Sequence, residues 1–171
     1  MNNKKLIIIA VIVVAVFCAV LSANVNKLNR LPDPTPTPAA TESTKAPSKM
    51  APVVAKMFDN DLKQAFGNNY QTELDTEEGV FRVDTWSSDV NAQFITDLKN
   101  GNIDITAWNA VVDRVKSVTS SMQRTFDEVC DDEIIVVSSI CDPLNHDISY
   151  LTVANGVAGY DVVNDIDLLN K

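Results

Sequence analysis

The chain has 171 residues, of which 14 are basic and 23 are acidic, so its formal net charge at neutral pH is −9. This length suits one domain, or one small domain with appendages, and an acidic balance with a single histidine argues against a basic nucleic-acid-binding surface. Three cysteines are too few for a disulfide-dense scaffold or a four-cysteine zinc site.

The charge divides the chain into two parts. Residues 1–50 carry a net charge of +4, whereas residues 51–171 carry 8 basic and 21 acidic side chains, a net charge of −13. A body this acidic repels phosphate backbones and anionic lipid head groups and attracts cations or basic partners. We therefore expect no nucleic-acid partner, and a basic protein or Ca²⁺ is the partner that the charge favours. The alternative is that the charge serves solubility alone.

Residues 1–23 resemble a membrane segment. Lys4 and Lys5 precede an apolar run from Leu6 to Ala23 in which only Ser22 is polar. A helix of this length would span about 27 Å, close to the ~30 Å hydrocarbon core of a bilayer, so we expect an uncleaved anchor that contacts the membrane through residues 6–23. Two alternatives are a cleaved signal peptide, since Leu21-Ser22-Ala23 approximates a cleavage site, and a lipoprotein anchored at Cys18.

Residues 24–50 have the composition of a stalk. Prolines 32, 34, 36 and 38 alternate with Asp33, Thr35 and Thr37, and alternating proline favours extended polyproline II with no apolar set to bury. Stalks rich in Ser, Thr and Pro are common outside a membrane. We therefore expect the C-terminal domain to be extracytoplasmic and membrane-anchored, or secreted if the N-terminal segment is cleaved.

The acidic domain, residues 51–171, begins with a predicted helix and a hairpin. Apolar residues recur every four positions between Val54 and Phe66, and Gly67 follows as a helix cap. Alternation then predicts strands over 70–75 and 81–85, joined by a turn that ends at Gly79.

Two helices are predicted next. Ser88 or Asp89 can cap a helix that contains Leu98 and ends at Gly101. Thr106 can cap a longer helix, whose apolar residues are spaced by three and four positions throughout. These residues are Trp108, Val111, Val112, Val115, Val118, Met122, Phe126 and Val129. Such a stripe is typical of a helix that covers a sheet.

Three strands complete the predicted domain. The first covers 134–140, and a turn over 143–146 leads to a second over 148–154. Asn155-Gly156 is a strong hairpin signal, so a third strand over 157–162 should pair back, with Gly159 marking a bulge.

The predicted order α-β-β-α-α-β-β-β indicates an α+β fold, with a mainly antiparallel sheet of about five strands packed against helices and preceded by an N-terminal transmembrane helix. This order is similar to that of profilin-like and roadblock-like domains. No motif accompanies the similarity, so it implies nothing about function.

Candidate chemistry is sparse. His146 lies beside Asp147 in a predicted turn and could act as a base, but no nucleophile elbow accompanies it, and a lone histidine in a turn is usually solvated. Cys130 and Cys141 flank a predicted strand of about 23 Å, whereas a disulfide requires Cα atoms within about 7 Å. We therefore expect the two cysteines not to be bonded.

A run of acids follows the long helix. These residues are Asp127, Glu128, Asp131, Asp132 and Glu133. Their mutual repulsion, added to the negative end of the helix dipole, would be relieved by Ca²⁺ or by a basic partner, and they form the candidate metal site. Their spacing does not match an EF-hand. The alternative is a solvated loop screened by salt.

These features together favour a binding or interaction module without catalysis and without a cofactor. One alternative is a small secreted hydrolase that uses carboxylates and His146. The other is a calcium-dependent structural or adhesion module.

Overall fold

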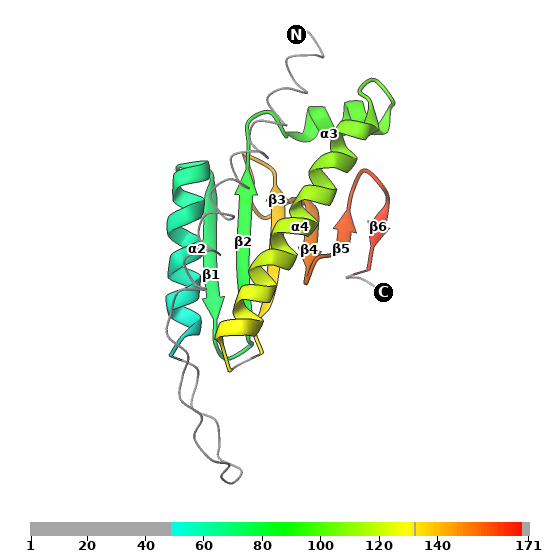
Figure 1. The fold of residues 1–171 in the computed structure, drawn as a ribbon. Helices are drawn as coiled ribbons and strands as arrows, with labels where there is room; N and C mark the ends of the chain where they lie inside the picture. The colour runs from blue at the N-terminus through cyan, green and yellow to red at the C-terminus, as the bar shows by residue number, and fades with distance from the viewer. Residues whose placement is uncertain (1–48, 132, 169–171) are drawn as a thin grey trace, which may run out of the picture.

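The computed structural model describes residues 49–131 and 133–168. They form an α+β domain with three helices and a six-stranded, mostly antiparallel sheet (Figure 1). The elements are α2 (Ala51–Phe66), β1 (Tyr70–Asp75), β2 (Val80–Trp86), α3 (Ala92–Lys99), α4 (Ile105–Val129), β3 (Ile135–Cys141), β4 (Ser149–Ala154), β5 (Val157–Asp161) and β6 (Ile166–Asp167). The α+β class and the mainly antiparallel sheet predicted from the sequence are confirmed.

The predicted membrane anchor, residues 6–23, lies outside the described residues, as does the predicted stalk up to residue 48. Among the helices that the structure does describe, none is long and apolar enough to cross a bilayer.

The strands lie side by side in their chain order, from β1 to β6. Neighbouring strands are antiparallel except β2 and β3, which run parallel with Val80 beside Ile135 and Trp86 beside Cys141. A parallel pair needs a long crossover, which α3 and α4 supply. The predicted count of about five strands was one too low, because β6 contains only Ile166 and Asp167 and two residues show no alternation.

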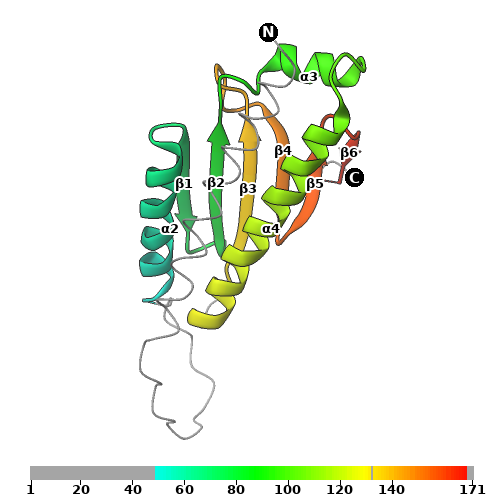
Figure 2. The ribbon, with the colours of Figure 1, turned by 45° about the horizontal axis from the view of Figure 1, so that its top comes forward.

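Helices α2 and α4 lie on one face of the sheet, and α3 lies across its end (Figure 2). Beneath α2 and the second half of α4, the rings of Phe58, Phe81 and Phe126 lie with centroids 5.3–6.2 Å apart. This cluster is the core of the first half of the domain. The four-residue spacing of α2 places its apolar residues on this one face.

A second core cluster lies beneath α3 and the first half of α4. Trp108 and Val112 of α4 pack there with Ile95 of α3 and with Leu151 and Val153 of β4. The apolar stripe predicted for the long helix is therefore the face that covers the sheet, and it contributes to both clusters.

The caps of α3 and α4 differ from the predicted ones. Asn91, not Ser88 or Asp89, caps α3, because its Oδ1 accepts a hydrogen bond from Phe94 N at 3.1 Å. Asp104, not Thr106, caps α4, and its Oδ1 accepts from the amide of Thr106 itself at 2.9 Å. A cap precedes the first turn that it satisfies, and Thr106 is already inside that turn.

The hairpin between β4 and β5 is as predicted. Asn155 and Gly156 have φ of 47° and 75°, the left-handed pair that a tight two-residue turn requires. Thr152 pairs with Tyr160 and Val153 with Ala158. Gly159 is therefore the extra residue of a bulge, as its position predicted.

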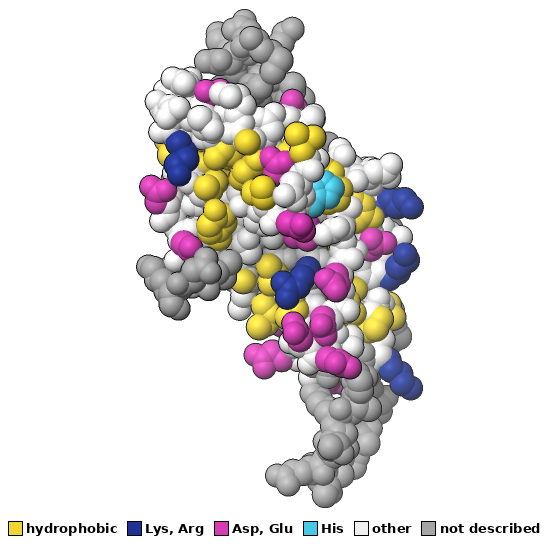
Figure 3. All heavy atoms as spheres, turned by 180° about the vertical axis from the view of Figure 1, so that it is seen from behind, with side chains coloured by type: hydrophobic (Ala, Val, Ile, Leu, Met, Phe, Trp, Pro, Cys, Tyr) yellow, Lys and Arg dark blue, Asp and Glu magenta, His cyan; other side chains and the backbone are white. Residues whose placement is uncertain are grey.

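Among the described elements, no helix covers the other face of the sheet. Figure 3 shows this face, on which hydrophobic side chains are interspersed with acidic ones. The alternation of β2 places Arg82 and Trp86 on one face, while the buried Phe81 and Val83 face the helices. Trp86 thus stands where the open face meets the end of the sheet.

Candidate binding cleft

An open cleft of about 610 Å³ lies at the carboxyl ends of the parallel strands β2 and β3. The chain leaves these strands in different directions, into α3 after β2 and into a tight turn after β3, and such points are common ligand sites in open sheets. The lining residues are Asn69, Trp86, Ser88, Asn91, Ala92, Gln93, Asp142, Pro143 and Leu144.

Asp142 fixes the wall of the cleft that follows β3. Its Oδ1 accepts hydrogen bonds from the amides of Leu144 at 2.7 Å and Asn145 at 3.0 Å, and its Oδ2 accepts from the hydroxyl of Tyr150. The Tyr150 hydrogen bond, together with these amides, lowers the pKa of Asp142 below its usual value. Burial and the same carboxylate raise the pKa of Tyr150 to about 12. Asp142 is therefore an engaged, structural carboxylate.

Trp86 forms the aromatic part of the cleft. The imidazole of His146 stacks on its indole, with ring centroids 3.7 Å apart and an interplanar angle of 21°. The Trp86 backbone N–H donates to Asn69 O at 3.1 Å. Trp86 is half-buried and His146 is exposed, so the stack is an outer surface of the domain beside the cleft.

The polar groups on the α3 side of the cleft are uncharged. Asn91 is used by the fold, since its Oδ1 caps α3 and its Nδ2 donates to Ser88 O at 2.9 Å. Gln93 is exposed and donates from Nε2 to Asp97 at 3.2 Å, and its Oε1 accepts no hydrogen bond from the described residues. Within the described part of the chain, the side chains of Asn69 and Ser88 make no hydrogen bond, and both residues are exposed.

The predicted pair of His146 and Asp147 is adjacent but not joined. No hydrogen bond links their side chains in the part of the chain that the structure describes; the Asp147 amide instead donates to Asn145 Oδ1 at 3.2 Å. His146 contacts the Trp86 ring instead. Hydrolysis through His146 stays a prediction.

The acidic candidate site lies at the opposite end of the domain. Asp127 and Glu128 lie in the last turn of α4, and Asp131 and Glu133 follow before β3, while Asp132 lies outside the described residues. The turn of β1 and β2, which carries Glu77 and Glu78, meets this segment, because Ile135 N donates to Gly79 O at 2.7 Å. Across residues 49–131 and 133–168, no three His, Cys, Asp or Glu side chains are grouped to hold a metal ion. Calcium binding by the full set stays a prediction.

No disulfide joins Cys130 to Cys141, as the length of the intervening strand predicted. Cys130 caps the end of α4, and Cys141 ends β3 beside Trp86. Burial raises the pKa of the Cys141 thiol, and the nearby carboxylates of Asp84 and Asp147 add to this effect.

The residues that line the cleft were not predicted. Trp86 ends a strand and is followed by Ser87-Ser88. An aromatic residue at the end of a strand is the one local feature of the sequence that could have indicated a binding residue here. The lining comes from three chain segments separated by roughly twenty to fifty positions. The β1–β2 hairpin places Asn69 beside Trp86, and only the register of β2 against β3 brings Asp142 there.

No protein-family model matches the chain, and no curated protein or solved structure is significantly similar to it. Function must therefore be argued from the site itself.

Proposed function

We propose that the chain is a membrane-anchored, extracytoplasmic binding module without catalysis, and that it binds its ligand in the cleft beside Trp86. The observation that carries this proposal is the composition of the cleft. It is open and partly apolar, and it offers amide and hydroxyl groups, while its one charged lining residue, Asp142, already accepts three hydrogen bonds. A few placed polar groups on an apolar wall are typical of a recognition site.

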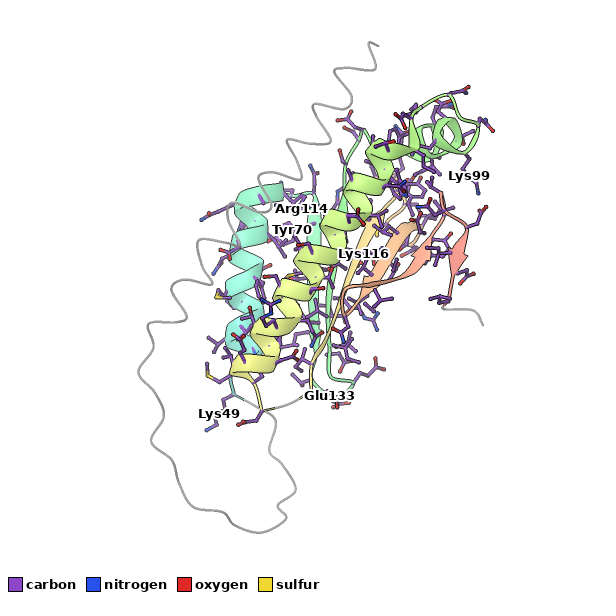
Figure 4. The ribbon with its side chains drawn as sticks, turned by 45° about the vertical axis from the view of Figure 1, so that its right-hand side comes forward. Lys49, Tyr70, Lys99, Arg114, Lys116 and Glu133 are labelled. Carbon is purple, nitrogen blue, oxygen red and sulfur yellow. The ribbon has the colours of Figure 1, made fainter. Side chains whose placement is uncertain are left out.

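The position of the cleft supports a projecting module. The chain enters the domain at Lys49 and Met50, at the end where α4 finishes, and Figure 4 shows Lys49 and Glu133 at this same end of the domain. The carboxyl ends of β2 and β3 lie at the other end of the sheet (Figure 1). A stalk joined at Lys49 would therefore hold the domain with the cleft facing away from the anchor.

The charge of the stalk end supports the same orientation. The turn of β1 and β2 and the segment after α4 both place acidic residues at the end of the domain that Lys49 enters, among them Glu77, Glu78 and Glu133. An anionic lipid surface repels such an end. The repulsion would keep the domain clear of the bilayer, with the cleft accessible.

Topology is tested by labelling in intact cells. His146 is exposed, so His146→Cys, in a chain whose native cysteines are replaced by serine, should react with a membrane-impermeant maleimide before lysis. Labelling only after lysis would contradict an extracytoplasmic domain.

Binding is tested with the purified full-length chain, immobilised and incubated with solubilised cell-envelope material. Trp86→Ala should lower the retained material about tenfold, because a central aromatic contact often dominates a site. Asn68→Ala, at an exposed neighbour of the cleft, should not change it. Equal retention by the wild type and Trp86→Ala would rule out the cleft as the site.

A further inference from the structure

We propose that the ligand of this cleft is a neutral saccharide. This inference rests on the proposed binding function and deepens it by naming the chemical class of the ligand. The evidence for a neutral saccharide is that the stacked indole of Trp86 lines the same cleft as the uncharged side chains of Asn69, Ser88 and Gln93.

The indole of Trp86 supplies a flat apolar surface. His146 covers one face of the ring and holds the ring in place. A ligand in the cleft would therefore lie against the part of the ring that lines the cleft, and little conformational freedom would be lost when it binds. An aromatic ring combines a large apolar area with a negative face. The C–H-bearing face of a sugar ring is apolar and slightly positive, and it fits such a surface. The exposed Leu144 extends the apolar wall.

The polar groups of the cleft match hydroxyl groups. A sugar hydroxyl is both a donor and an acceptor, and an amide side chain offers both functions. Asn69 has both functions available, Gln93 retains its Oε1, and Ser88 adds a hydroxyl, as described above. Asn69 directly precedes β1, Ser88 lies in the loop between β2 and α3, and Gln93 lies in α3. Three separate segments therefore contribute polar groups to the cleft that Trp86 lines.

The charge of the cleft selects against ionic ligands. No Lys or Arg is among the lining residues, so a carboxylate, sulfate or phosphate would lose its hydration without gaining a counter-charge. A cation would meet Asp142, whose carboxylate is already engaged by Tyr150 and by the Leu144 and Asn145 amides. A neutral, hydroxyl-rich ligand meets neither penalty.

The experiment is a fluorescence titration of the full-length chain in a detergent without a sugar head group. The probes are neutral tetrasaccharides of glucose, galactose, mannose and N-acetylglucosamine, with tetragalacturonate as the anionic counterpart. The chain has two tryptophans, and Trp108 is buried, so a change in emission reports mainly on Trp86.

At least one neutral probe should bind. Asn69→Ala and Gln93→Ala should each weaken it about threefold to tenfold, the effect of one hydrogen bond. The matched variant Asn68→Ala should bind as the wild type does.

The outcomes separate this inference from the proposed function. If no neutral probe binds, or tetragalacturonate binds more tightly, the neutral-saccharide assignment is overturned. If envelope protein is retained in a Trp86-dependent way while no saccharide binds, the assignment falls and the binding function stands, with a peptide as the ligand class. If no saccharide binds and the retention of envelope material does not depend on Trp86, both proposals fall. Trp86→Ala is compared by circular dichroism with the wild type, and Asn69→Ala provides the test should Trp86→Ala unfold.

Discussion

The indole Nε1–H of Trp108 donates a hydrogen bond of 2.9 Å to Oδ1 of Asp161, and both residues are fully buried. This contact joins the first turn of α4 to the end of β5. The same Oδ1 accepts from the amides of Val163 and Asn164, at 3.0 and 3.2 Å. One carboxylate thus anchors the long helix and the turn into β6.

We expect Trp108→Phe to lower the free energy of unfolding by about 1–3 kcal/mol, because it removes a donor from a buried carboxylate. Urea unfolding of the full-length chain, followed by circular dichroism, measures this loss. The control is Leu144→Ala, at a side chain that is 94% exposed, where a change within about 0.5 kcal/mol is expected. A Trp108→Phe variant as stable as the wild type would show that the contact contributes nothing.

Replacing Gly156 in the β4–β5 turn by alanine should destabilise the fold. Gly156 has φ +75°, and an added Cβ would lie 2.0 Å from Ser120 Oγ of α4. Gly101 has φ +73° with nothing within 4 Å, so Gly101→Ala should cost only the left-handed strain of about 1–2 kcal/mol. Gly156→Ala should cost more than Gly101→Ala in urea unfolding, and adding Ser120→Ala should recover part of the difference. Equal costs for the two glycine variants would contradict this close approach.

The Tyr150–Asp142 hydrogen bond predicts that the stability of the fold decreases at acidic pH. It lowers the pKa of Asp142 in the folded state, and the unfolded value is about 3.9. The ionised carboxylate therefore stabilises the fold above about pH 4, and this contribution is lost as the pH falls through the folded pKa.

Tyr150→Phe removes the largest cause of that shift. Urea midpoints of the two proteins should differ at pH 6, and the difference should narrow at pH 3, where the pH is below the unfolded pKa of Asp142 and the wild type has begun to lose its advantage. If the difference in urea midpoint stays constant between pH 6 and pH 3, the Tyr150 hydroxyl stabilises the fold independently of the charge on Asp142.

Cys141 should be an unreactive thiol. It is buried, and its pKa is raised chiefly by that burial, whereas the thiolate is the reactive form. In a chain carrying Cys18→Ser and Cys130→Ser, we expect reaction with a disulfide reagent at pH 8 to be about tenfold or more slower than in urea. The companion chain that keeps only the half-buried Cys130 should react faster when folded. Equal rates would show that the end of β3 is open.

Local sequence signals predicted the parts of the fold that depend on local chemistry. The apolar stripe from Trp108 to Val129 and the Asn155-Gly156 turn are both present as predicted. The bulge at Gly159 is present too. Each of these follows from side-chain periodicity or from a backbone angle that few residues adopt.

The rest depends on contacts that no short window contains. The parallel pairing of β2 with β3 joins segments that are far apart in the chain, and α4 packs with both strands in the first core cluster. Gln123 is a buried polar residue of α4, and its amide accepts from Val136 N at 2.8 Å and donates to Ile134 O at 2.6 Å. A polar side chain that substitutes for a strand partner looks like a surface residue in the sequence. The cleft was missed for the same reason, since Trp86 and Asp142 meet only across this pairing.

The crossover between β2 and β3 also determines how the domain folds. Val80 pairs with Ile135, 55 positions along the chain, whereas the β1–β2 and β4–β5 hairpins close over a few residues. Closing a long loop is slower than closing a short one, because its entropy must be lost before any contact forms. The two hairpins should therefore form early and independently. The rate-limiting step should be the joining of β2 to β3 as α4, which contributes to both core clusters, docks across the seam.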